Sequence, residues 1–295
     1  MTTETVNDRY KGLDAWGAGD IMRAITKGNA RAVKAVEDAL PQLEAAAAGI
    51  EPRLRAGGRL FYAGAGTSGR LGVMDAAELA PTFGFDRTEV LLAGGGEAQD
   101  RAQEGAEDDV AAATAAVERA GIGPADALIG VAASGRTPYT VAAVKRAKEL
   151  GAFTVGIANN HGTPLLSVGD VGVLLDTGPE VLAGSTRLAA GTAQKAALNA
   201  LSTAVLVRLG GAYDNLMVGM RPLNAKLKKR AVEIVAQATG LERAEAATVL
   251  DDAGGDIRTA IVMAGTGADA RAATRLLEAN GHSVRAAIAA GGPNE

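Results

Sequence analysis

The feature that most constrains the fold is a repeated alternation between short apolar runs and longer stretches of helical periodicity. Each run is closed by glycine or small polar residues, and the runs cover residues 60–63, 90–93, 127–132, 153–158 and 171–175. Apolar residues at consecutive positions suit strands that are buried on both faces. Because helices separate the strands, the pattern predicts an α/β fold, a three-layer α-β-α arrangement with a five-stranded parallel sheet. Ligands of such folds bind at the carboxyl ends of the strands.

Helical periodicity flanks this core on both sides. Residues 19–56 have apolar positions at helical spacing, and Pro41 is expected to start a new helix within them. A long helix is predicted over residues 188–209, and short Ala-rich helical pieces follow from about residue 240. We therefore predict an N-terminal helical segment at 1–56, a ligand-binding α/β domain at 57–239 and a small helical domain at 240–295.

Composition excludes several classes of function. The formal net charge is −4 and aromatic residues make up 3% of the chain, which argues against a nucleic-acid surface. The chain has no cysteine, so thiolate metal sites and disulfides are excluded. The first twenty residues are polar and acidic, and no run of about 18 apolar residues occurs, so neither a secretory signal nor a membrane span is expected. We expect a cytoplasmic protein without a nucleic-acid or membrane partner.

The first strand leads into a glycine-rich loop that contains Gly66, Thr67 and Ser68. Two hydroxyl groups beside backbone amides at a helix N-terminus favour an anion, because the helix dipole is positive there. The spacing also fits a dinucleotide fingerprint, although the second strand ends in glycines and not in a ribose-binding carboxylate. We favour a phosphate or phosphosugar, and nucleotide binding or a plain glycine turn stay open.

The third strand ends in a similar loop, formed by Ser134, Gly135, Arg136 and Thr137. The triplet Ser-Gly-Arg therefore occurs at 68–70 and again at 134–136, each time directly after an apolar strand. Hydroxyl-bearing loops at neighbouring strand ends can converge on one phosphate group. Each arginine is either part of that site or an ordinary surface charge.

A third polar loop follows the fifth strand. Ser185 and Thr186 precede the long helix and are candidates for capping it, for contacting a ligand, or for both. Glu180 either binds sugar hydroxyls or holds the loop. From the pattern alone, Glu78 and Glu107 read as solvated helix residues. The two histidines have no partner at metal-ligand spacing, so no metal site is expected.

Long segments of this chain resemble N-acetylmuramic acid 6-phosphate etherases, which carry a sugar isomerase (SIS-type) domain. The similarity runs in order over roughly residues 30 to 290. The segments that carry it are Gly64–Gly72, Ala132–Tyr139, Gly178–Leu182, Gly184–Leu188, Gly191–Lys195 and Asn215–Val218.

The resemblance implies a specific reaction of bacterial cell-wall recycling. These lyases remove the D-lactyl ether from carbon 3 of N-acetylmuramic acid 6-phosphate, by elimination followed by addition of water, without a metal or redox cofactor. The family's two glutamates match Glu78 and Glu107. By that resemblance, Glu107 is the base at carbon 2, and Glu78 is the acid to the departing lactate and the base to the incoming water.

Two other functions are compatible with the same sequence features. An aldose–ketose isomerase would use the same fold, and so would a non-catalytic sensor, because a regulator of glucokinase resembles these etherases.

Glu78 lies ten residues beyond Ser68, which is roughly 15 Å along an uninterrupted helix. Either the chain bends back before Glu78 or a neighbouring subunit supplies a glutamate, so we predict a homodimer with active sites at the subunit boundary.

Overall fold

The structure, a computed structural model, describes residues 2–101, 103–222 and 224–292. These residues form two compact units. The first contains the residues up to Ala76 together with Arg87–Ser202, and the second contains Ala77–Asp86 and the residues from Thr203 onward. The predicted segment ends at residues 1 and 295 lie outside the described residues.

The first unit is built around a parallel sheet of five strands in the order β2-β1-β3-β4-β5. The strands are β1 Leu60–Gly64, β2 Thr88–Leu92, β3 Ala127–Val131, β4 Phe153–Ala158 and β5 Val171–Leu174. All five residues of β1 and of β3 are buried, as expected for central strands covered on both faces. The predicted three-layer parallel fold is confirmed.

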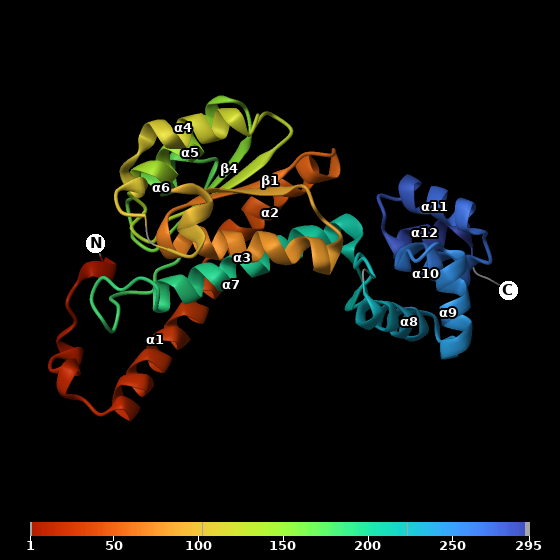
Figure 1. Ribbon diagram of the computed structural model, residues 1–295, viewed down its shortest axis with the longest axis horizontal. Helices are drawn as coiled ribbons and strands as arrows, with labels where there is room; N and C mark the ends of the chain where they lie inside the picture. The colour runs from red at the N-terminus through yellow and green to blue at the C-terminus, as the bar shows by residue number, and fades with distance from the viewer. Residues whose placement is uncertain (1, 102, 223, 293–295) are drawn as a thin grey trace. The chain divides into compact units, whose positions relative to one another are not determined.

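Helices cover both faces of this sheet (Figure 1). The helices of this part of the chain are α1 Ala18–Asp38, α2 Leu40–Arg55, α3 Gly66–Phe83, α4 Val110–Arg119, α5 Pro138–Glu149, α6 Pro164–Val168 and α7 Ala189–Leu206. On one face, α4, α5 and α6 pack against apolar side chains such as Phe61 and Leu128. On the other face lie α2, α3 and α7.

The strand order places the functional edge of the sheet. The chain leaves β1 through α3 on one face and returns to β3 through α4 on the other face. The connections therefore diverge between β1 and β3, and ligands of open parallel sheets bind at such a point, beyond the carboxyl ends of the strands. Both Ser-Gly-Arg loops follow these two strands.

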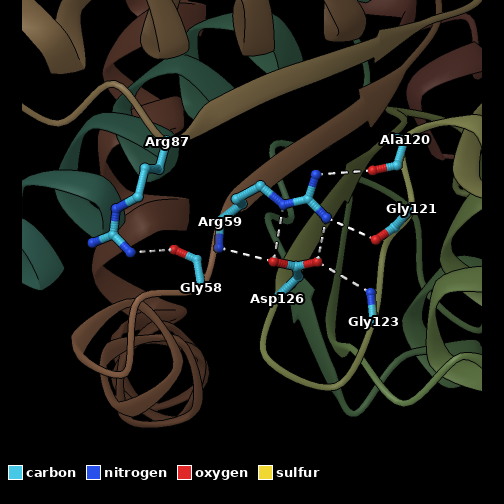
Figure 2. A network of polar contacts seen from close by, with 7 residues as sticks. All are labelled: Gly58, Arg59, Arg87, Ala120, Gly121, Gly123 and Asp126. Carbon is cyan, nitrogen blue, oxygen red and sulfur yellow. Dashed lines mark hydrogen bonds and ion pairs between the residues drawn. The ribbon is translucent and has the colours of Figure 1, made fainter.

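A polar network holds the opposite, amino ends of β1 and β3 together (Figure 2). The guanidinium and the backbone N–H of Arg59 donate to the buried carboxylate of Asp126 at distances of 2.8 to 3.2 Å. The same guanidinium donates to the carbonyl oxygens of Ala120 and Gly121, at 2.9 and 2.7 Å. Burial alone would raise the pKa of Asp126, but hydrogen bonds from Arg59 and from the Gly123 N–H outweigh it and hold that pKa below its ordinary value.

Asp126→Asn should destabilise the protein at neutral pH by about 1–2 kcal/mol, because it removes the charge that these donors face. The expected loss is modest because Arg59 is partly exposed, and water screens its ion pair. The folded-state pKa is lowered, so the contribution is complete above the ordinary carboxyl pKa of about 4 and is lost as pH falls below it. Urea unfolding of the parent and of Asp126→Asn at pH 7 and pH 3.5 measures the difference in their free energies of unfolding. A difference that stays constant with pH would contradict the assignment.

A second buried network fixes α3 between the sheet and α7. The carboxylate of Asp75 accepts hydrogen bonds from the hydroxyl of Tyr62 at 2.7 Å and from the Nδ2 of Asn199 at 2.6 Å. Ser202 donates to the same carboxylate at 3.3 Å. Burial and the neighbouring Asp75 raise the pKa of Tyr62 well above its ordinary value, so this hydroxyl remains a donor. The network holds the helix that starts at the first glycine-rich loop.

The second unit is mainly helical. It contains a π-helical turn at Val207–Gly211, a short hairpin of β6 Ala212–Tyr213 and β7 Leu216–Met217, and the helices α8 Ala225–Thr239, α9 Arg243–Asp252, α10 Ile257–Thr266, α11 Ala270–Ala279 and α12 Val284–Gly291. Side chains cap several of these short helices, including Asn224, Asp256, Asp269 and Ser283.

The apolar cluster of this unit includes residues of α8, such as Ile234 and Val235, together with residues of α9 to α12. Helix α8 packs with the helices that follow it. The domain bounds 1–56, 57–239 and 240–295 remain a prediction. Within the described ranges, no helix has both the length and the apolar character that a membrane crossing requires.

Candidate active site

A cavity of about 520 Å³ lies at the carboxyl ends of β1 and β3, a size typical of small-molecule sites. It brings together most of the residues that the sequence singles out. Those on its wall are Gly66, Thr67, Ser68, Glu107, Ser134, Arg136, Thr137 and Thr186. Glu4 and Asp108, which no motif of the sequence indicates, line the same cavity.

The first loop passes directly from β1 into α3. Helix α3 begins at Gly66, so Thr67 and Ser68 lie in its first turn, where the backbone N–H groups have no acceptor within the helix. The turn is tight: a Cβ atom on Gly64 would lie 2.8 Å from the Cα of Gly69. Glycine at both positions therefore allows the strand end and the helix start to approach each other, and the first turn of α3 lines the cavity.

The second loop passes from β3 into α5, which begins at Pro138. The hydroxyl oxygen of Ser134 accepts a hydrogen bond from the N–H of Arg136 at 3.1 Å and lies 3.3 Å from the Oγ1 of Thr137. Gly135 has a φ of 63°, and a Cβ atom there would lie 2.1 Å from the Oγ1 of Thr163. The loop is thus locally fixed, with its hydroxyl groups and a second helix N-terminus at the cavity.

The two arginines of the repeated triplet have different surroundings. The Nε of Arg70 donates to the carbonyl oxygens of Ala98 and Gln99, both at 3.0 Å, and so holds the loop after β2. The side chain of Arg136 is exposed and lines the cavity. Of the two, only Arg136 is placed to contact an anion there.

Glu180 has a structural environment. It is 1% exposed, and its carboxylate accepts hydrogen bonds from the N–H groups of Ala189 and Ala190 at 3.0 and 2.9 Å. It therefore caps the N-terminus of α7, and the geometry favours the loop-holding alternative over contact with sugar hydroxyls. Thr186 lines the cavity, whereas Ser185 is not part of its wall.

The two candidate catalytic glutamates are placed differently. Glu107 lies in a short 3₁₀ turn, Ala106–Asp108, and lines the cavity. Glu78 is an exposed residue of α3, which continues without interruption from Gly66 to Phe83. The chain does not bend back before Glu78, so Glu78 lies three helical turns, roughly 15 Å, along α3 from Ser68.

The chemistry of the cavity follows from these groups. Two helix N-termini, the hydroxyl groups of Ser68 and Ser134 and the guanidinium of Arg136 suit a phosphate group. The carboxylate of Glu107 lies on the same cavity wall, and a carboxylate is a group that can accept a proton. Among the residues that the structure describes, no three His, Cys, Asp or Glu side chains gather as a metal site would require.

Comparison with known families identifies the domain type. The profile of the glucokinase regulatory protein N-terminal SIS domain matches residues 42–148, and that of the SIS domain matches residues 108–204. A protein from Bacteroides fragilis NCTC 9343, assigned as a phosphosugar isomerase involved in capsule formation, shares the fold. Its TM-score is 0.50 at 21% identity, over 66% of this chain and 94% of the other.

Curated relatives are more similar and cover nearly the whole chain. An N-acetylmuramic acid 6-phosphate etherase of Deinococcus radiodurans is 52% identical over 263 residues, which are 88% of this chain and 86% of the relative. One of Rubrobacter xylanophilus is 49% identical over 264 residues, which are 89% and 88% of the two chains.

Proposed function

This chain belongs to the N-acetylmuramic acid 6-phosphate etherase family, and we propose that it cleaves the D-lactyl ether of N-acetylmuramic acid 6-phosphate. The products are N-acetylglucosamine 6-phosphate and D-lactate, and the enzyme is a carbon–oxygen lyase. The observation that carries the proposal is the convergence of Ser68, Ser134 and Glu107 on one cavity in a chain with etherase relatives.

The phosphate of the substrate is bound where the two repeated loops meet. The N-terminal turns of α3 and α5 supply backbone N–H groups and positive dipole ends, and Ser68 and Ser134 supply hydroxyl groups. Arg136 balances part of the dianion's charge. This end of the cavity anchors the sugar, which leaves its carbon 2 and carbon 3 to the carboxylates.

Glu107 removes the proton from carbon 2. Opening of the sugar ring exposes an aldehyde at carbon 1, which makes the neighbouring proton acidic. The carboxylate of Glu107 takes this proton, the bond from carbon 3 to the lactyl oxygen breaks, and an alkene forms between carbons 2 and 3. Water then adds to carbon 3 while carbon 2 regains a proton. The position of Glu107 on the cavity wall supports this role.

Glu78 protonates the departing lactyl oxygen and then takes a proton from the incoming water. In this proposal a second copy of the chain supplies Glu78, so the enzyme works as a homodimer with shared sites. The unbroken helix α3 supports it, because Glu78 lies three turns from the phosphate loop of its own subunit. Met74, exposed one turn before Glu78 on the same helix face, gives this region an apolar contact group.

Two other functions predict different products. An isomerase would only move a proton between carbons 1 and 2 and would release no lactate. A sensor would bind the sugar phosphate without converting it. The retention of both Glu78 and Glu107 in this chain favours the lyase. We place the reaction in the recycling of cell-wall amino sugars, in the cytoplasm.

Release of D-lactate by the purified protein tests the function. We expect release from N-acetylmuramic acid 6-phosphate and very little from the unphosphorylated sugar, because the phosphate supplies the anchoring contacts. Ser68→Ala and Ser134→Ala should each raise KM by about 10- to 100-fold, the worth of one hydrogen bond to a charged group, with a smaller change in kcat.

Ser167→Ala is the matched control for these variants. Its exposed hydroxyl donates to the carbonyl of Pro164 in α6, away from the cavity wall, so its KM should equal that of the parent. Unchanged KM values in both loop variants would show that the phosphate site is misplaced. Conversion of the sugar without lactate release would support the isomerase.

A further inference from the structure

The N-terminal residues Thr2–Glu4 form a short 3₁₀ turn at the edge of the cavity, which we call the N-terminal strap. Its central residue, Thr3, is 0% exposed, although it stands almost at the start of a polar segment. The Nδ2 of Asn160 donates to the hydroxyl of Thr3 at 3.0 Å, and the N–H of Thr3 donates to the Oδ1 of Asn160 at 3.3 Å. The strap is therefore anchored by a buried pair of hydrogen bonds.

The same contacts tie the strap to the loops of the candidate site. The Nδ2 of Asn160 also donates at 2.8 Å to the carbonyl of Ala133, the residue directly before Ser134. On its other side, the carbonyl of Thr3 accepts from the N–H of Gly184 at 3.1 Å, two residues before Thr186. The strap thus bridges the loop after β3 and the loop before α7, and its position is linked to that of the phosphate-binding hydroxyl groups.

This anchoring places the side chain of Glu4 on the cavity wall, with Ser68, Ser134 and Arg136. Among the described residues, none donates a hydrogen bond to its carboxylate. A carboxylate repels a phosphate dianion, so Glu4 does not help to bind the phosphate itself. Its carboxylate is suited to accept hydrogen bonds from neutral donor groups elsewhere on the ligand.

We propose that Glu4 is a specificity residue that accepts hydrogen bonds from donor groups of the sugar, either hydroxyl groups or the acetamide N–H, and that Thr3 positions it. The inference rests on the proposed function, since it assumes that a sugar phosphate occupies the cavity. Thr3 and Asn160 restrict where the carboxylate lies, so less freedom is lost when the ligand binds.

Calorimetric titration with two ligands separates the roles of Glu4 and the phosphate loops. The ligands are N-acetylglucosamine 6-phosphate, which lacks the lactyl group, and inorganic phosphate. Glu4→Ala should weaken binding of the sugar phosphate by about 10- to 100-fold, because a hydrogen bond to a charged acceptor is lost. Its affinity for inorganic phosphate should stay equal to the parent's or increase, because a repulsive charge is removed.

The positioning role of Thr3 is tested with a pair of variants. Thr3→Val keeps the shape but loses the hydroxyl, so it should weaken binding of the sugar phosphate and leave inorganic phosphate unaffected. Thr3→Ser keeps the hydroxyl and should bind both ligands as the parent does. Asp8→Ala, in the same segment but paired with Lys11 away from the cavity wall, is the control.

2-Deoxyglucose 6-phosphate distinguishes the donor groups, because it has no donor on carbon 2 and keeps the other hydroxyl groups. If the acetamide N–H is the partner, Glu4→Ala should bind this sugar as the parent does; if the other hydroxyl groups are, the variant should lose affinity for both sugars. Unchanged binding of both sugar phosphates by Glu4→Ala overturns the inference alone. A parent protein that binds neither a sugar phosphate nor inorganic phosphate overturns the proposed function and the inference together.

Discussion

In heavy water, a Glu107→Gln variant should lose both the exchange of the carbon-2 proton and the release of lactate, each by about 10²- to 10⁴-fold. Glu78→Gln should lose lactate release to the same degree but keep the exchange. The reason is the order of the steps: removal of the carbon-2 proton precedes departure of the lactyl oxygen. Glutamine preserves the size of the side chain, but it carries no charge and cannot accept and return a proton.

The two readouts come from one reaction mixture. Proton NMR follows replacement of the carbon-2 proton by deuterium, and a coupled D-lactate dehydrogenase assay follows the product. Glu104→Gln is the control, because Glu104 is exposed, lies three residues before Glu107 and is not part of the cavity wall. Loss of exchange in the Glu78 variant, with exchange retained in the Glu107 variant, would reverse the two assignments.

Mixed dimers should recover activity from two variants that are each nearly inactive. In each mixed dimer, one subunit carries Glu78→Gln, and the other subunit carries Ser68→Ala together with Ser134→Ala. If each site takes its phosphate loops from one subunit and Glu78 from the other, every mixed dimer has one intact site of two. Dimers isolated through two different affinity tags should therefore have about half of the activity of the parent enzyme, as expected for a symmetric dimer.

A second mixture is the control for this complementation. Glu107 lines the same cavity as Ser68 and Ser134 of its own subunit. A mixed dimer of Glu107→Gln with the double serine variant therefore has no intact site and should stay inactive. Recovery in neither mixture, or a parent enzyme that is fully active as a monomer, would contradict the shared site.

Much of the fold follows from local properties of the sequence. Consecutive apolar residues such as those at 127–131 and 153–158, in short runs closed by glycine or polar residues, are typical of strands buried on both faces, so the parallel sheet is predictable without tertiary information. The carboxyl ends of parallel strands lie on one edge of a sheet. For that reason, the loops that contain Ser68 and Ser134 could be expected to meet, and the cavity contains both.

Other features depended on which distant groups meet in space. Glu180 and Glu107 are both glutamates in polar loops, yet one caps the amides of Ala189 and Ala190 and the other lines the cavity. The triplet Ser-Gly-Arg is identical at both positions. Arg70, however, donates hydrogen bonds to the carbonyl oxygens of Ala98 and Gln99, whereas Arg136 lines the cavity. A local pattern specifies which groups need hydrogen-bond partners, whereas only the packed chain decides which partner reaches them.

The layers of the fold and the two strand-end loops could therefore be predicted from local patterns, because burial and backbone geometry act over a few residues. The place of the N-terminal strap instead depends on long-range packing. Thr3 meets Asn160 across 157 positions of the chain, and this contact brings Glu4 to the cavity. No local periodicity or turn signal predicts such a contact. The contact depends on where β4 ends relative to a segment that precedes the first helix.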